Sequence, residues 1–163
     1  TWPIANLAEL DGPDPFEKSL GPDGIALLLA NIQRCVEGSR TFMPIELPDL
    51  SIAPKPGYVS KFGVLVTVPV APRRTAEYEK AAKEMQGVIA KTNAKAYSVG
   101  KVLYGGNPNQ YLGALALDNF ADLANFGLAY RKAVAEAQIA PQAGIVTNIT
   151  YEVYTAIPEI SIQ

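Results

Sequence analysis

Residues 62–70, FGVLVTVPV, decide the fold of this chain. The stretch is rich in β-branched residues and is bounded by glycine and proline, which is typical of a β-strand. Val64, Leu65 and Val66 are consecutive apolar residues. Neighbouring side chains of a strand point to opposite faces of its sheet, so this strand needs apolar cover on both faces.

The residues after this strand alternate between helical and strand patterns. Residues 75–92 place apolar side chains at helical spacing, with Thr75 as the expected N-cap, and Asn119 with Asp122 resembles a capping box. Glycine, asparagine and proline at 105–109 indicate a hairpin loop. The expected order is strand, helix, strand, strand, helix and strand, at 62–70, 75–92, 96–104, 110–117, from Asn119 to a break near Pro141, and 149–157.

This order predicts an α+β fold of the ferredoxin-like β-α-β-β-α-β type. Its antiparallel sheet would have four strands, with both helices on one face. Residues 112–117, LGALAL, are apolar on both faces like the first strand. The face without helices therefore needs a second sheet, from another subunit or another repeat.

An internal similarity suggests such a repeat. Phe16–Leu20 followed by Ile25 resembles Tyr130–Val134 followed by Ile139. On this basis, residues 1–54 form the second half of one ferredoxin-like repeat, with a closing strand at 41–47, and residues 55–163 form a complete one. We expect the chain to be a processed or incompletely represented piece of a tandem protein; chance similarity is the alternative.

Three segments together resemble a known superfamily. They are VPVAP at 68–72 leading into EYEK at 77–80, YGGNPNQY at 104–111, and FADL at 120–123. This ordered set resembles the dimeric α/β-barrel superfamily, in particular uncharacterised bacterial members related to NIPSNAP-like and antibiotic-biosynthesis-monooxygenase-like proteins. The resemblance covers about residues 58–162 and implies two ferredoxin-like units joined sheet to sheet, as a dimer or a tandem. Members of the superfamily range from oxygenases and isomerases to proteins without known activity.

Composition excludes several functional classes. Histidine is absent, which removes the commonest general base and zinc ligand and puts haem chemistry of the superfamily's histidine-dependent kind in doubt. A net charge of −2 without basic blocks indicates no nucleic-acid partner, and no apolar run is long enough to predict a membrane span. Asp118, Asp122 and Glu159 lack convergent spacing, so we expect no metal and no cofactor. The compartment is left open between cytoplasm and periplasm.

Tyrosines are the main candidate site residues. Those on the expected helix and strands could surround a cavity between sheet and helices, where an aromatic ligand would meet apolar walls and hydroxyl groups. The alternative is that they pack in the core and at interfaces. Glu152 is a weak candidate for a general base, and otherwise a solvated edge residue. The tyrosines are Tyr78, Tyr97, Tyr104, Tyr111 and Tyr154, with Tyr151 beside them.

Three other features have a structural and a functional interpretation. The glycines at 105–106 lack the spacing of a phosphate-binding motif, so a plain hairpin is favoured. Cys35 lies on the apolar stripe of a helix expected to end near Gly38, which predicts a buried core cysteine. Arg73 and Arg74 could bind a carboxylate, with a solvated turn as the alternative.

Two functional hypotheses follow. The first is a binding or structural module that associates with itself through its sheet face, because both faces of the strands are apolar. The second is a cofactor-independent monooxygenase or isomerase that acts on a small aromatic or polyketide-like molecule in the tyrosine-lined cavity.

Overall fold

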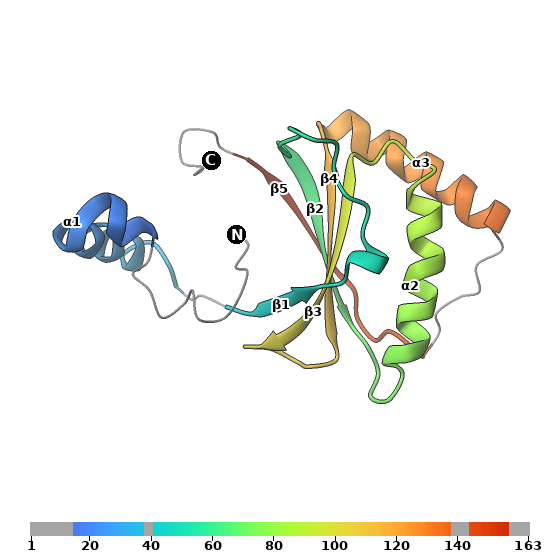
Figure 1. The fold of residues 1–163 in the computed structure, drawn as a ribbon, viewed down its shortest axis with the longest axis horizontal. Coiled ribbons are helices and arrows are strands. Elements are labelled where there is room, and N and C mark those ends of the chain that lie inside the picture. The colour runs from blue at the N-terminus through green and yellow to red at the C-terminus, as the bar shows by residue number, and fades with distance from the viewer. Residues whose placement is uncertain (1–14, 38–40, 138–143, 157–163) are drawn as a thin grey trace. The chain divides into compact units, whose positions relative to one another are not determined.

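The predicted strand at 62–70 forms β2 (Phe62–Pro69) in a computed structural model that describes residues 15–37, 41–137 and 144–156 (Figure 1). β2 is hydrogen-bonded on both sides. It pairs antiparallel with β4 (Gln110–Leu117) and with β5 (Thr150–Thr155), and β4 pairs in turn with β3 (Ala96–Tyr104). The bounds of β3 and β4 are those predicted from the sequence.

A fifth strand corrects the prediction of a four-stranded sheet. β1 (Met43–Glu46), from the segment expected to close the first repeat, pairs antiparallel with the outer edge of β3. Leu47 continues the pairing, since its N–H donates to the Val99 carbonyl at 2.7 Å. In a four-stranded sheet the edge of β3 would present unpaired backbone groups, and β1 satisfies them. The sheet order is therefore β1-β3-β4-β2-β5.

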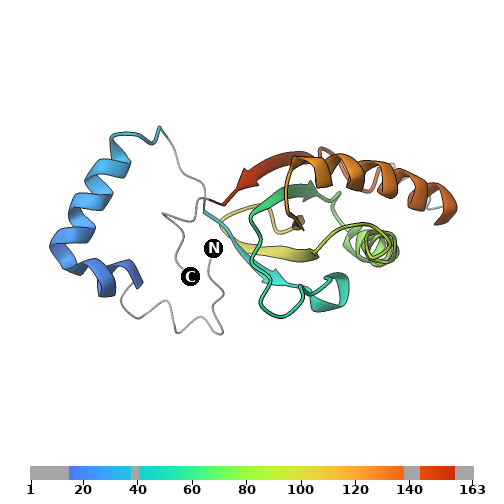
Figure 2. The same ribbon diagram turned by 90° about the horizontal axis from the view of Figure 1, so that it is seen from above.

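Helices α2 (Thr75–Ile89) and α3 (Phe120–Ala137) lie on the same face of this sheet, as Figures 1 and 2 show. The helix predicted for 75–92 ends three residues earlier, at Ile89, whose carbonyl accepts a hydrogen bond from the Thr92 hydroxyl at 2.6 Å. The prediction of Thr75 as N-cap is wrong, because Thr75 is the first helical residue and Arg74 precedes it as the N-cap. The capping pair at the start of α3 is present. Asn119 Oδ1 accepts from the Asp122 N–H at 3.0 Å, and the Asp122 carboxylate accepts from the N–H of Asp118 at 3.3 Å.

The strand order and the position of the helices define the fold. Without β1 the order is β5-β2-β4-β3, with α2 following β2 and α3 following β4. This is the split β-α-β arrangement. The chain thus has an α+β, ferredoxin-like fold built on an open antiparallel sheet of five strands.

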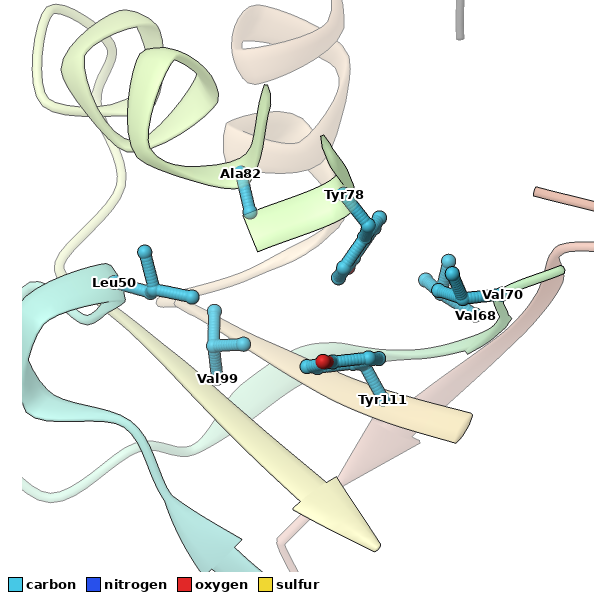
Figure 3. Close-up of a cluster of buried hydrophobic side chains, with 7 residues drawn as sticks. All are labelled: Leu50, Val68, Val70, Tyr78, Ala82, Val99 and Tyr111. Atoms are coloured by element: carbon cyan, nitrogen blue, oxygen red, sulfur yellow. The ribbon is translucent and has the colours of Figure 1, made fainter. Parts of the chain in front are cut away.

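The core lies between the sheet and its helices. One cluster joins Tyr78 and Ala82 of α2 to Val99 and Tyr111 of the strands below them (Figure 3). The rings of Tyr78 and Tyr111 meet with centroids 4.5 Å apart and an interplanar angle of 48°. Tilted aromatic pairs of this kind add about 0.5–1.5 kcal/mol beyond burial. A second cluster surrounds Phe62, Ile89 and Leu117.

The chain divides into two compact units, residues 1–40 and 41–163. The sheet, α2 and α3 all belong to the second unit, because β1 pairs with β3. The assignment of residues 1–54 to a half repeat stays a prediction.

The first unit contains α1 (Pro15–Gln33), which is interrupted at Gly21, with φ of 68°, just before Pro22. The prediction that Cys35 is buried in the core is wrong, because this thiol is exposed. α1 ends two residues earlier, and the Cys35 N–H donates to the Ile32 carbonyl in a turn. Leu29 and Ile32, which lie on the same predicted stripe and inside α1, are exposed as well, so the stripe as a whole is not buried in a core. None of the described helices is long and apolar enough to cross a membrane.

Candidate functional site

A cavity of about 560 Å³ lies between the sheet and the two helices of the second unit. Its size is within the usual range for small-molecule sites, roughly 300–1,000 Å³. Its walls are mainly aliphatic and aromatic. They are formed by Val64, Val66, Val68, Tyr78, Ala82, Met85, Ile89, Tyr97, Leu115, Leu123, Phe126, Gly127, Tyr130, Arg131, Ile149 and Tyr151.

The periodicity of each element explains why its residues reach the cavity. Alternate residues of β2 point toward the helices, which places Val64, Val66 and Val68 on the floor. On α3, five positions that follow the i, i+3, i+4, i+7 and i+8 pattern of one helix face line the opposite wall, from Leu123 to Arg131. Gly127 is one of these five, and a Cβ at this position would meet nothing within 4 Å. The helix backbone therefore borders the cavity directly.

Four tyrosines line this space from four different elements, and Tyr78 of α2 is one of them. Tyr97 lies on β3, Tyr130 on α3 and Tyr151 on β5. Burial, followed by the proximity of Tyr130 and Tyr151, raises the pKa of Tyr97 to about 12. Burial and then Tyr151 also raise the pKa of Tyr130. Near neutral pH Tyr97 and Tyr130 are consequently neutral and can donate hydrogen bonds.

Tyr130 is held in place by its neighbours on the two helices. Its hydroxyl donates to Met85 Sδ at 2.9 Å, and its ring stacks on Phe126 with centroids 5.5 Å apart. A thioether is a weak acceptor. The hydroxyl of Tyr130 can therefore turn to a stronger acceptor at little cost when a ligand supplies one.

Two of the predicted tyrosines lie close together near one end of the cavity. Tyr78 lines the wall, and burial is the main cause that raises its pKa. Tyr111 is fully buried under Tyr78 and is not among the lining residues; its hydroxyl donates to Glu79 Oε1 at 2.5 Å. Burial first, and then this carboxylate, raise the pKa of Tyr111.

The other predicted site residues lie outside the cavity. Tyr104 is 61% exposed at the end of β3. Tyr154 and Glu152 pair with Gly63 and Leu65, which alternate with the cavity-facing residues of β2, so both point to the sheet face without helices. Glu152 is exposed there. The structure thus brings together Tyr78 and Tyr97 of the predicted set, together with Tyr151.

Tyr130 and Arg131 were not identified as site residues from the sequence. The available signal was the spacing of Leu123, Phe126, Gly127, Tyr130 and Arg131 along one helix face. The sequence predicts a helix here from Ala121, Leu123, Phe126, Leu128, Tyr130 and Val134, and a helical stripe does not distinguish packed residues from cavity-lining ones.

The remaining polar candidates have structural partners. The glycine-rich segment 105–109 is the β3–β4 hairpin loop, with Gly105 at φ of 80°. Arg74 pairs with Glu77 at 2.5 Å and donates to the Gly144 carbonyl at 3.2 Å. Across the described ranges, no three Cys, Asp or Glu side chains lie close enough together to hold a metal ion.

Comparisons with known proteins relate the fold to two solved structures. A "putative monooxygenase" from Lactobacillus acidophilus NCFM matches with a TM-score of 0.56 and 14% identity over 91% of this chain and 64% of the other. A "putative monooxygenase" from Fusobacterium nucleatum matches with a TM-score of 0.54 and 10% identity over 86% of this chain and 65% of the other. No family model and no curated protein matches the sequence. At these identities the likeness shows the fold alone, and this chain spans slightly less than two thirds of either structure.

Proposed function

We propose that this chain binds a small aromatic or polyketide-like molecule in the cavity between its sheet and helices and oxygenates it without a cofactor. The observation that carries the proposal is the cavity itself, of about 560 Å³, with apolar walls and the four phenols of Tyr78, Tyr97, Tyr130 and Tyr151. Flat apolar walls favour aromatic rings, and a few hydroxyl groups orient them. The two solved structures of similar fold, each described as a "putative monooxygenase", support this proposal.

The reaction would use the substrate as its own reductant. A substrate with an acidic methylene group, R₂CH₂, loses a proton to give the carbanion R₂CH⁻. The carbanion transfers two electrons to O₂ as a C–O bond forms, which gives the peroxide R₂CHOO⁻. Proton return and cleavage of the O–O bond release water and leave the ketone R₂C=O. The balance is R₂CH₂ + O₂ → R₂C=O + H₂O, and it requires neither flavin nor metal.

The chain would contribute binding and electrostatics to this reaction. Neutral phenols in an apolar cavity donate hydrogen bonds to the oxygen on which the negative charge of the delocalised carbanion accumulates. No carboxylate lies among the described lining residues, so the proton would leave to solvent or to another acceptor. Substrates that are already partly ionised at the working pH are therefore the best candidates.

Filling the cavity tests this proposal. Gly127→Leu should place its side chain in open space inside the cavity and abolish the oxidation of a tricyclic anthrone such as dithranol, followed by oxygen uptake and ketone formation. The matched control is Gly87→Leu, because Gly87 is helical and exposed, is not among the lining residues, and also has nothing within 4 Å of an added Cβ. Both changes favour helix by a similar amount, about 1 kcal/mol. If both variants oxidise the anthrone at the wild-type rate, the cavity is not an active site.

A second function, self-association through the sheet, is favoured by the open edge at β5. All six residues of β5 are exposed, and Val153 is 50% exposed although it pairs with the buried Val64. An uncovered apolar edge strand is a template for pairing with another strand. We propose a second copy of this chain as the occupant of this edge.

Sedimentation equilibrium distinguishes this second function from the first. Val153→Lys should shift the chain toward monomer, because the charge would be buried at the contact. Leu103→Lys is the control, since Leu103 is 48% exposed on β3, away from β5. A wild-type chain that stays monomeric at high concentration contradicts the proposed association and leaves the cavity function intact.

A further inference from the structure

We propose that Arg131 binds an anionic oxygen of the cavity's ligand, so that the ligand is an apolar ring system that carries a carboxylate or a phenolate. This inference rests on the proposed function, because it concerns the same cavity. It adds the chemical class of the ligand and names Arg131 as the residue that recognises it.

Arg131 is the only charged residue among those that line the cavity within the described ranges. It follows Tyr130 on α3 and lies one helical turn beyond Gly127. Arg131 is an exposed residue. Arginine side chains at the border of an apolar surface generally cover it with their methylene groups and keep the guanidinium in water.

This guanidinium has no anionic partner in the part of the chain that the structure describes. The ion pairs found there use other cations: Arg74 with Glu77, Lys95 with Asp118, Lys101 with Glu79, and Lys132 with Glu136. Lys132, the next residue along α3, does have a partner, Glu136 on the same helix. The cations of this segment are therefore not unpaired in general. Its five N–H donors are available to a bound molecule.

The other polar groups of the cavity suit the same kind of ligand. Tyr78, Tyr97, Tyr130 and Tyr151 present hydroxyl groups, and within the described residues the Tyr130 hydroxyl is bound to a thioether sulfur alone. A ligand anion would meet hydrogen-bond donors and one positive charge, with no carboxylate to repel it. A ligand cation would find no opposite charge among these lining residues and would face Arg131.

Three naphthalene probes of similar ring size test the inference by calorimetry at neutral pH. 2-Naphthoate supplies a carboxylate, 2,4-dinitro-1-naphtholate supplies a phenolate, and 2-naphthamide is the uncharged control. The variant is Arg131→Met, which keeps the apolar stem and removes the charge. Lys132→Met is the matched control, because Lys132 is adjacent but its side chain is 80% exposed and paired along the helix.

The expected result is specific for anions. The wild type and Lys132→Met should bind at least one of the two anions about tenfold more tightly than 2-naphthamide, as a charge-assisted bidentate contact allows. Arg131→Met should lose that preference without losing its affinity for 2-naphthamide, and Arg131→Lys should retain part of it. The anion that shows the larger loss identifies the ligand as a carboxylate or a phenolate.

Failure of this inference can be told apart from failure of the proposed function. If all three probes bind, Gly127→Leu blocks them, and Arg131→Met changes none of the affinities, then the cavity binds ligands and the role of Arg131 is refuted. If no probe binds the wild type, or Gly127→Leu leaves binding unchanged, the proposed function fails and the inference about Arg131 fails with it.

Discussion

The ring of Tyr97 on β3 lies across Gly113 on β4, so closely that a Cβ on Gly113 would be 3.2 Å from the Tyr97 hydroxyl oxygen and 3.4 Å from Cε2. The absence of a side chain at position 113 thus makes room for a cavity-lining phenol. Because the atoms in the way belong to a side chain that borders open space, the ring can shift by a few tenths of an ångström.

Gly113→Ala should therefore affect ligand binding more than stability. We expect the free energy of unfolding to stay within about 1 kcal/mol of the wild type, since an added methyl group in a strand offsets the strain. The displaced Tyr97 ring should weaken the binding of 2-naphthoate several-fold. Urea unfolding and calorimetry on the same preparation check both parts, and a large loss of stability with unchanged binding would contradict them.

Gly63→Ala should instead destabilise the fold, by about 2–3 kcal/mol. A Cβ at this position would lie 2.5 Å from the backbone carbonyl oxygen of Leu115 and closer still to the hydroxyl of Tyr154. A backbone atom in the middle of a sheet cannot move aside as Tyr97 can. Urea unfolding measures the loss, and Gly87→Ala serves as control, because it should raise stability slightly.

The hydrogen bond from Tyr111 to Glu79 should stabilise the packing of α2 on the sheet. Tyr111→Phe keeps the buried ring and removes the hydroxyl, so we expect a loss of about 1 kcal/mol, because Glu79 remains partly solvated. Glu79→Gln retains an acceptor oxygen and should cost less. A double-mutant cycle gives the coupling energy, and a value near zero would show that Tyr111 contributes only through its ring.

Alkaline pH should destabilise the fold through Tyr97. Its pKa is raised to about 12, above the ordinary value of 10.0, so the folded state disfavours the phenolate relative to the unfolded chain. The resulting stability is fully present below pH 10 and is lost as the pH rises from 10 through 12. In Tyr97→Phe the urea concentration at the unfolding midpoint should fall less steeply with pH between 10 and 12 than in the wild type. An equal slope in both proteins would contradict the raised pKa of Tyr97.

Sequence patterns were sufficient to predict the main helices and strands of the second unit. The apolar, strand-forming composition of β2, β3 and β4, the glycine-rich hairpin after Tyr104 and the Asn119 cap are local properties. The structure has these elements at or within a residue or two of the expected bounds. Their order alone implied the ferredoxin-like arrangement. Local patterns could not predict the pairing of β1 with β3, because four residues carry too little information to select a partner strand.

The site was only half predictable for a related reason. Tyr78 and Tyr97 were identified because they are polar groups on apolar elements, whereas Tyr130 and Arg131 belong to an ordinary amphipathic stripe. Cys35 shows the opposite error, since a periodic apolar pattern predicted burial, yet Leu29 and Ile32 of the same stripe are exposed too. Whether a stripe packs tightly or borders a cavity depends on the volumes of residues from other elements.

By itself, the sequence determined which segments become strands and helices and in what order they follow one another, because backbone propensity and side-chain periodicity are set within a few residues. Only the tertiary structure decided that the sheet has a fifth strand and that α2, α3 and the sheet leave a cavity with four phenols and one guanidinium that has no ion-pair partner among the described residues. Those features arise from contacts between residues far apart in the chain, where packing volume and charge are balanced in three dimensions.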